Sequence, residues 1–241
     1  MKAIILAGGK GTRGKPYTDY FPKAMTPINA KPLIEYIVKY LDSHKFISEI
    51  IIVSDYNGLG GQIQNYLGEL KTHSKLSFVQ DSQSGTGGDL LHVSSKIKES
   101  EFILWFVDNL CAINLKDMWE RFKRKKSLAC IATRSSRKEE TGFAKVEDGI
   151  IQEFVEKPMM NLQMPECLGV YIISKSILRK IKEKSKKKDV NLSFDILQEL
   201  SREGKVSSFD IGKSLWVDVE SPVFVERNQK MINNIIKQMK V

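Results

Sequence analysis

A glycine-rich loop near the N-terminus and an acid that ends an apolar run are the features of this sequence that could do chemistry. The loop, LAGGKGTRGKP at residues 6–16, combines four glycines with three cationic side chains. Glycines let backbone N–H groups approach a phosphate closely, and Arg13 adds positive charge. Asp108 follows the apolar run FILWFV, where a cation would offset the cost of burying its carboxylate. These residues predict a site for a phosphorylated ligand.

Two common phosphate-binding motifs fit the loop but not the residues after it. Gly9, Gly11 and Gly14 spell G-x-G-x-x-G, the dinucleotide fingerprint, which requires a helix to begin at once. The continuation, KPYTDYFPKAMTPINAKP, holds four prolines, which break a helix. Residues 9–15 also match the start of a hydrolase P-loop, but Pro16 replaces the Ser or Thr that would bind Mg²⁺. An NAD-dependent oxidoreductase is therefore a remote alternative.

Strands and helices alternate through the first half of the chain, which indicates a parallel sheet covered on both faces. The expected strands there are residues 2–8, 49–55, 76–80 and 102–108, with helices at 32–44 and 60–70 and one beginning at 87. Later strands are expected at 127–134, 167–174, 205–211 and 214–219, a hairpin at 143–157, and helices at 175–184, at 193–203 and after Ser221. Ligands bind at the carboxyl ends of strands in such sheets, so the loop after the first strand is well placed for phosphates.

Composition is that of an ordinary globular protein. The 241 residues, 41% hydrophobic and 28% charged, are interpreted as one domain over 1–241 with no membrane span and no export signal, so that a cytoplasmic location is expected. The cysteines Cys111, Cys130 and Cys167 are scattered, which fits a reducing compartment and gives no zinc framework. Three dispersed histidines make a histidine-based metal site improbable.

The net charge of +9 suits an anionic partner. Much of the excess lies in two runs, RFKRKK at 121–126 and KIKEKSKKK at 180–188. Neither run is interleaved with the aromatic residues that a single-stranded nucleic acid requires. We interpret both as solvated helix ends, and expect neither a nucleic-acid partner nor a membrane partner.

A third motif accounts for the loop and its continuation together. Sugar-1-phosphate nucleotidyltransferases carry the pattern L-A-G-G-x-G-T-R-L-x-P-L-T-x-x-x-P-K-x-M-x-P-I-x-x-K-P, and LAGGKGTRGKPYTDYFPKAMTPINAKP resembles it nearly from end to end. The resemblance extends over about residues 1–225. It implies a Rossmann-like three-layer α/β sandwich with a mostly parallel central sheet and a small antiparallel sugar-binding lobe. We expect this lobe to fold against the sheet.

The resemblance also implies an activity and its substrates. A sugar 1-phosphate attacks the α-phosphorus of an NTP in line, in a Mg²⁺-dependent displacement that releases pyrophosphate and gives an NDP-sugar. The implied partners are the NTP and the sugar 1-phosphate, with a homo-oligomer left open. No hexapeptide repeat is present, so only the transferase domain is implied.

Individual residues take roles from this resemblance. Catalytic roles fall to Arg13, Lys23 and Lys157, and metal binding to Asp108 and Asp218. Nucleotide binding is implied for Leu6, Ala7, Gly8, Gly9, Gly11, Thr12, Arg13, Gln80, Gly85 and Thr86. Sugar-phosphate binding is implied for Asn109, Gly142, Glu156, Lys157 and Tyr171. The base stays open. Gln80 and the Asp108-Asn109 pair resemble thymidylyl- and uridylyl-transferring members, which favours pyrimidine nucleotides slightly, whereas GTGG at 85–88 is similar to guanylyltransferases that act on mannose or heptose phosphates.

Several positions depart from the family pattern. Gly14 replaces a leucine, Val107 and Glu220 replace glycines beside the two acids, and the Cys167-Leu168 pair stands where many members have Asn-Ala. We expect Gly14 to loosen the loop and Glu220 to add negative charge near the metal. These departures keep a second hypothesis open, a non-catalytic or regulatory relative that binds sugar nucleotides.

Overall fold

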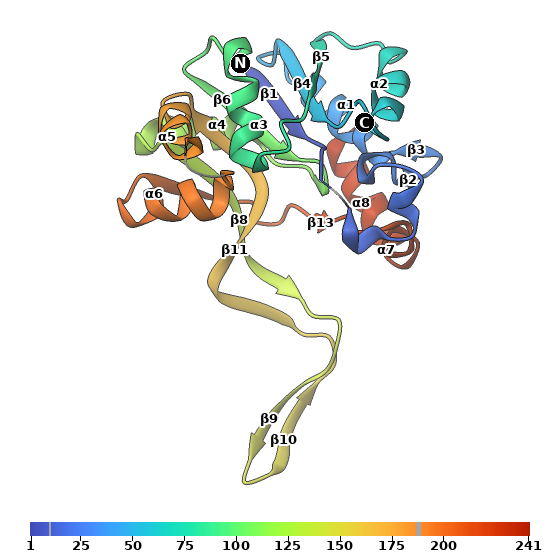
Figure 1. Ribbon diagram of the computed structural model, residues 1–241. Helices are drawn as coiled ribbons and strands as arrows, with labels where there is room; N and C mark the ends of the chain where they lie inside the picture. Colours follow the sequence, from blue (N-terminus) through green and yellow to red (C-terminus); the bar gives the residue numbers. More distant parts are fainter. Residues whose placement is uncertain (10, 187–188) are drawn as a thin grey trace.

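A seven-stranded sheet runs through the centre of the protein, whose computed structural model describes residues 1–9, 11–186 and 189–241 (Figure 1). Its strand order is β12-β8-β11-β6-β1-β4-β5. These strands are β1 (Lys2–Leu6), β4 (Glu49–Ser54), β5 (Lys75–Gln80), β6 (Glu101–Phe106), β8 (Ala129–Lys138), β11 (Met159–Ser174) and β12 (Val206–Asp210). Neighbouring strands are parallel except where β11 pairs with β6 and β8. The expected mostly parallel sheet is confirmed.

Helices cover both faces of the sheet, which explains why its central strands are apolar throughout. One face packs against α1 (Leu33–Asp42), α2 (Gly61–Gly68), α4 (Leu115–Lys125), α7 (Pro222–Arg227) and α8 (Gln229–Met239). The other packs against α3 (Gly85–His92), α5 (Ile177–Ser185), the π-helical turn Leu192–Leu197 and α6 (Gln198–Arg202). Ile4 and Ile5 of β1 are fully buried in opposite layers. The three-layer α/β sandwich is therefore confirmed.

The structure adds detail to elements that the sequence predicts only in part. The sequence predicts only a helix end at the basic run 121–126, and the structure shows the whole helix, α4. This helix begins after Asn114, whose side-chain oxygen accepts a hydrogen bond from the Asp117 N–H. The strands β7 (Asn109–Cys111) and β13 (Trp216–Asp218) pair antiparallel, which brings Asp218 opposite Asn109. The basic run 180–188 begins in α5, with Lys187 and Lys188 outside the described residues.

The second half of the chain also forms a long projection, which we call the arm and define as residues 139–166. Its hairpin, β9 (Phe143–Glu147) and β10 (Ile150–Val155), lies where the sequence predicts it and turns at Asp148 and Gly149, both at positive φ. We expected this antiparallel lobe to fold against the sheet. Instead it extends far from the body (Figure 1), because the pairing of β8 with β11 continues outward to Lys138 and Met159.

No helix within the described residues is both long enough and apolar enough to cross a membrane.

Candidate functional site

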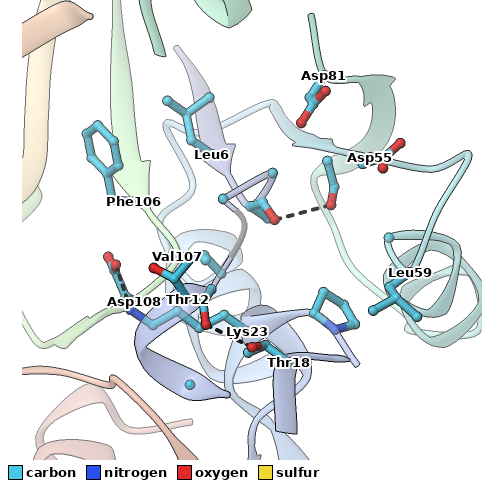
Figure 2. Close-up of a pocket in the computed structure, with 18 of the residues that line it drawn as sticks. Leu6, Thr12, Thr18, Lys23, Asp55, Leu59, Asp81, Phe106, Val107 and Asp108 are labelled. Carbon is cyan, nitrogen blue, oxygen red and sulfur yellow. Dashed lines mark hydrogen bonds and ion pairs between the residues drawn. The ribbon is translucent and has the colours of Figure 1, made fainter. Parts of the chain in front are cut away.

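A cavity of about 730 Å³ lies at the carboxyl edge of the sheet, where β1, β4, β5 and β6 end (Figure 2). Parallel strands end at one edge, so the residues that follow them are brought together. The glycine loop after β1 forms one wall, and Asp55, Asp81 and Asp108 follow the other three strands. The cavity therefore occurs where the sequence placed the phosphate loop.

Short turns, not an α-helix, follow the glycine loop. Three 3₁₀ turns, Thr12–Gly14, Tyr17–Asp19 and Lys23–Met25, occupy the proline-rich stretch, and the first α-helix begins at Leu33. Thr18 Oγ1 donates to the Gly11 carbonyl at 2.8 Å, and Gly11 has a left-handed φ of 59°. The helix that a dinucleotide fingerprint requires therefore does not form at these residues.

Gly14 is a packed position in this loop. It is buried, and a Cβ there would lie 2.7 Å from Thr18 Cγ2 and 3.2 Å from the Glu220 carbonyl oxygen. A leucine would meet both groups. We expected Gly14 to loosen the loop, but the absence of a side chain lets two segments approach closely.

Two cations and three carboxylates form a network at the mouth of the loop. Lys23 Nζ lies 2.9 Å from Asp108 Oδ2 and 3.3 Å from Asp218 Oδ1, with its side chain only 12% exposed. Arg13 contacts Asp218 at 3.4 Å and also pairs with Glu220. The structure thus brings together Asp108 and Asp218, which lie 110 residues apart in the sequence.

The carboxylate pair is suited to a cation. Burial raises the pKa of Asp218, and repulsion by Asp108 adds to this, although Lys23 and Arg13 act in the opposite direction. The Asp218 carboxylate in turn raises the pKa of Arg13. Asp108 and Asp218, which the Lys23 ammonium contacts at 2.9 and 3.3 Å, are the residues that would hold a metal ion. Within the described residues no cluster of three His, Cys, Asp or Glu ligands occurs, so phosphate oxygens and water would complete the shell of a hard cation such as Mg²⁺.

Asn109 fixes the geometry of this corner and is itself buried. Its Nδ2 donates to Asp108 Oδ1 at 2.7 Å, and its Oδ1 accepts from the Gly169 N–H and from the Trp216 indole, each at 2.8 Å. The amide thereby links three segments that lie far apart in the chain. The sequence assigns Asn109 to sugar-phosphate binding. In the structure its side chain makes these internal hydrogen bonds.

The far end of the cavity is acidic. Gln80, expected to read the base, does not line the cavity: its Oε1 accepts from the N–H groups of Tyr56 and Asn57, and its Nε2 donates to Asp55 at 2.9 Å. Asp81 does line the cavity, and its buried Oδ1 has no hydrogen-bond partner within the described residues. Burial raises the pKa of Asp81, and the Asp89 and Asp55 carboxylates raise it further.

Sequence reasoning missed Asp81, although a signal was available. Asp81 directly follows a strand that ends in Gln80, the same placement that identified Asp108. The family pattern drew attention to Gln80 instead.

Most predicted nucleotide residues lie around the cavity. These are Leu6, Ala7, Gly8, Gly9, Gly11, Thr12, Arg13, Gly85 and Thr86. Tyr171 is buried behind the cavity wall, with its ring 5.7 Å from that of Phe106, and burial raises its pKa to about 12.

The remaining sugar residues are not brought to the cavity. Gly142, Glu156 and Lys157 lie on the arm, and the Phe154 ring lies directly over Gly142. The expected sugar site is thus divided between the body and the arm.

Comparison with known proteins identifies the family. The model of the nucleotidyl transferase family matches residues 2–232. The low-salt glycan biosynthesis nucleotidyltransferase of Haloferax volcanii is 26% identical over 97% of this chain and 67% of its own length. The D-glycero-alpha-D-manno-heptose 1-phosphate guanylyltransferase of Aneurinibacillus thermoaerophilus is 26% identical over 98% of this chain and all of its own. This chain spans 56% of a bifunctional protein of Methanococcus maripaludis, which is 27% identical.

Solved structures share the fold. A Bacillus anthracis structure assigned as a glucose-1-phosphate thymidylyltransferase superposes with a TM-score of 0.76 at 23% identity, covering all of this chain and 99% of the other. A UDP-glucose pyrophosphorylase complexed with UDP-glucose gives a TM-score of 0.65 at 23% identity over 98% of both chains.

Proposed function

The chain belongs to the nucleotidyl transferase family, and we propose that it transfers a nucleotidyl group from an NTP to a sugar 1-phosphate. The observation that carries this proposal is the network of Arg13, Lys23, Asp108 and Asp218 beside a glycine loop at the mouth of a 730 Å³ cavity. The heptose and mannose 1-phosphate guanylyltransferases among its relatives support the sugar phosphate as acceptor.

The reaction needs positioning and charge neutralisation more than a protein nucleophile. A phosphate oxygen of the sugar 1-phosphate forms a bond to the α-phosphorus, and the bond from that phosphorus to the bridging oxygen of the β-phosphate breaks. Pyrophosphate leaves with the electron pair. Backbone N–H groups of the loop hold the phosphates, and Arg13 and Lys23 offset the charge that develops on the leaving group.

A divalent cation fits this site. Asp108 and Asp218 would hold Mg²⁺, which supplies a positive charge that neutralises the triphosphate when bound. Lys23 now pairs with both acids, and it would be released toward the phosphates.

We assign the base end of the cavity to Asp81 and the base to guanine. A carboxylate only accepts hydrogen bonds, and guanine presents two adjacent donors, N1–H and N2–H₂, on one edge. Thymine and uracil present one donor between two carbonyl oxygens, which a carboxylate repels. The Asp81 carboxylate, which lines the cavity, is therefore matched to GTP, in agreement with the guanylyltransferases among the relatives.

The acceptor end would use residues on the arm. Glu156 would accept hydrogen bonds from sugar hydroxyls, and Lys157 would pair with the 1-phosphate.

Pyrophosphate release across a matrix of four NTPs and several sugar 1-phosphates, with Mg²⁺, tests the function. GTP should be the preferred nucleotide. Asp81→Asn converts one acceptor oxygen into an NH₂ donor, which should raise the KM for GTP by roughly 5- to 150-fold, the cost of about 1–3 kcal/mol for a bidentate pair. Asp210→Asn, at an exposed acid on β12, is the matched control. Equal use of GTP and dTTP by the parent protein would exclude the assignment of the base.

A second candidate is a relative that binds nucleotide without turning it over. Its specific support is that Arg13 pairs with both Asp218 and Glu220. The guanidinium that would bind the phosphates is therefore already engaged by carboxylates. GTP binding by calorimetry without pyrophosphate release for any sugar 1-phosphate would favour it.

A further inference from the structure

The side-chain amide of Asn109 makes every hydrogen bond that its chemistry allows. An amide offers two N–H donors and two lone pairs on its oxygen. Nδ2 donates to the Phe106 carbonyl at 3.3 Å and to Asp108 Oδ1 at 2.7 Å. Oδ1 accepts from the Gly169 N–H and the Trp216 indole, each at 2.8 Å. The residue is only 5% exposed, so these contacts within the described residues leave no donor or acceptor for a sugar phosphate.

The two partners of Oδ1 decide which way round the amide lies. A backbone N–H and an indole N–H only donate, so the amide atom that meets both Gly169 and Trp216 has to be the oxygen. The NH₂ group is thereby turned toward Asp108. The opposite orientation would set the NH₂ group against two donors and the oxygen against a carboxylate. Gly169 and Trp216 therefore fix the direction of the hydrogen bond that Asp108 receives.

Asn109 is also held tightly in place. A Cβ at position 169 would lie 2.1 Å from Asn109 Nδ2, so only the glycine there lets the amide approach this closely. The Trp105 indole donates to the Asn109 backbone carbonyl at 2.7 Å. Groups from β6, β11 and β13 thus hold both the backbone and the side chain of this one residue.

The hydrogen bond from Asn109 distinguishes the two oxygens of Asp108. Oδ1 accepts from the amide, and Oδ2 lies 2.9 Å from Lys23 Nζ. The oxygens of Asp218 differ in the same way, since Oδ1 lies 3.3 Å from Lys23 and Oδ2 lies 3.4 Å from Arg13. Each acid therefore turns a single oxygen toward Lys23.

One available oxygen from each acid suits Mg²⁺ better than Ca²⁺. Mg²⁺ is bound through one or two carboxylates and keeps water and phosphate oxygens around it, whereas the larger Ca²⁺ takes more oxygens and often both oxygens of one carboxylate. While the Asn109 amide occupies Oδ1, Asp108 offers only Oδ2. Loss of that hydrogen bond would make both oxygens available.

We propose that Asn109 is a positioning residue that presents one oxygen of Asp108 to a small divalent cation, and that the Trp216 indole holds the amide in that role. This role replaces the sugar-phosphate contact that the family resemblance implies for Asn109. The proposal rests on the proposed function for its nucleotide and cation, but it concerns binding and does not require turnover.

Trp216→Phe tests this role, because it removes the indole N–H and keeps an aromatic ring under Arg134. Calorimetry of the full chain, with the NTP that the parent chain binds most tightly, is carried out in Mg²⁺, in Ca²⁺ and without a divalent cation. The factor by which Mg²⁺ strengthens NTP binding should fall by roughly 2- to 10-fold, the value of one hydrogen bond. The factor for Ca²⁺ should not fall, and the affinity without a cation should be unchanged.

Trp119→Phe is the matched control. Trp119 is also half-buried, and its indole also makes one hydrogen bond, to Glu101 at 2.9 Å, but it lies on α4 and does not line the cavity. This variant should leave all three affinities unchanged. Asn109→Leu removes the amide itself and should lower the Mg²⁺ factor further. It also leaves buried donors unpaired, so Trp216→Phe decides if this variant does not fold.

Steady-state pyrophosphate release separates positioning from acceptor binding. Trp216→Phe should lower kcat and leave the KM for the sugar 1-phosphate unchanged, because the Asn109 amide contacts Asp108 and not the acceptor. A raised KM for the sugar 1-phosphate with an unchanged kcat would mean that the amide binds the acceptor, and it would overturn the proposal.

The outcomes distinguish this proposal from the proposed function. An unchanged Mg²⁺ factor, or equal losses with Mg²⁺ and Ca²⁺, overturns the role of Asn109, while turnover by the parent chain keeps the proposed function. A parent chain without turnover overturns the proposed function, and the Mg²⁺ factor of Trp216→Phe then still decides the role of Asn109. A parent chain whose NTP binding no divalent cation strengthens overturns both.

Discussion

The cavity and the arm hold their polar side chains in opposite ways. At the cavity, Lys23 and Asp108 are fixed by ion pairs and by the buried Asn109 amide. On the arm, Glu156 and Lys157 are exposed on a hairpin that has no layer packed on its apolar face among the described residues. The body therefore supplies a preorganised phosphate site, whereas the arm supplies residues whose position depends on what covers it.

The largest expected difference between the regions is catalytic. Asp108→Asn keeps the size of the side chain but removes the charge that a cation requires, so turnover should fall by a hundredfold or more, on the order of 3 kcal/mol. Steady-state pyrophosphate release measures it, with Asp210→Asn as the control. Turnover within a few-fold of the parent chain would show that the carboxylate pair is not the centre of the site.

The next largest difference between the body and the arm is expected in how much a substitution lowers the free energy of unfolding. Ile51→Ala on β4, at a fully buried side chain, should lower the free energy of unfolding by about 2–5 kcal/mol. Phe154→Ser on the arm should change it by less than about 0.5 kcal/mol. Urea unfolding at low protein concentration, where association contributes little, gives both values. Equal losses would contradict the separation, because they would make the arm part of the cooperative core.

The smallest expected effect lies where Arg13 meets Glu220. Glu220→Gln removes one of the carboxylates that neutralise Arg13, so GTP should bind more tightly. The pair is well exposed, at 60% and 41%, which limits the gain to about 1 kcal/mol, roughly five-fold. Calorimetry measures the affinity, and Glu226→Gln at an exposed acid of α7 is the control. Weaker binding would show that Glu220 positions Arg13 for the phosphates.

Sequence reasoning was most successful where one local pattern decides the structure. The apolar runs located the strands of the sheet, and strand ends located Asp108 because a parallel sheet gathers them at one edge. Gly14 was misjudged, because Glu220 comes from a distant segment and Thr18 is brought back against Gly14 by the turn between them. The direction of the arm was also missed, since a hairpin pattern fixes pairing but not which way the hairpin leaves the sheet.

Trp216 has a consequence for measurement. Its indole N–H donates to the Asn109 amide beside Asp108, while the Arg134 guanidinium at the root of the arm lies over its ring. Its fluorescence should therefore respond both to a ligand at the carboxylates and to a reorientation of the arm. Trp216 is thus an intrinsic optical probe at the junction of the two regions, and comparison with a Trp216→Phe variant separates its signal from that of Trp105 and Trp119.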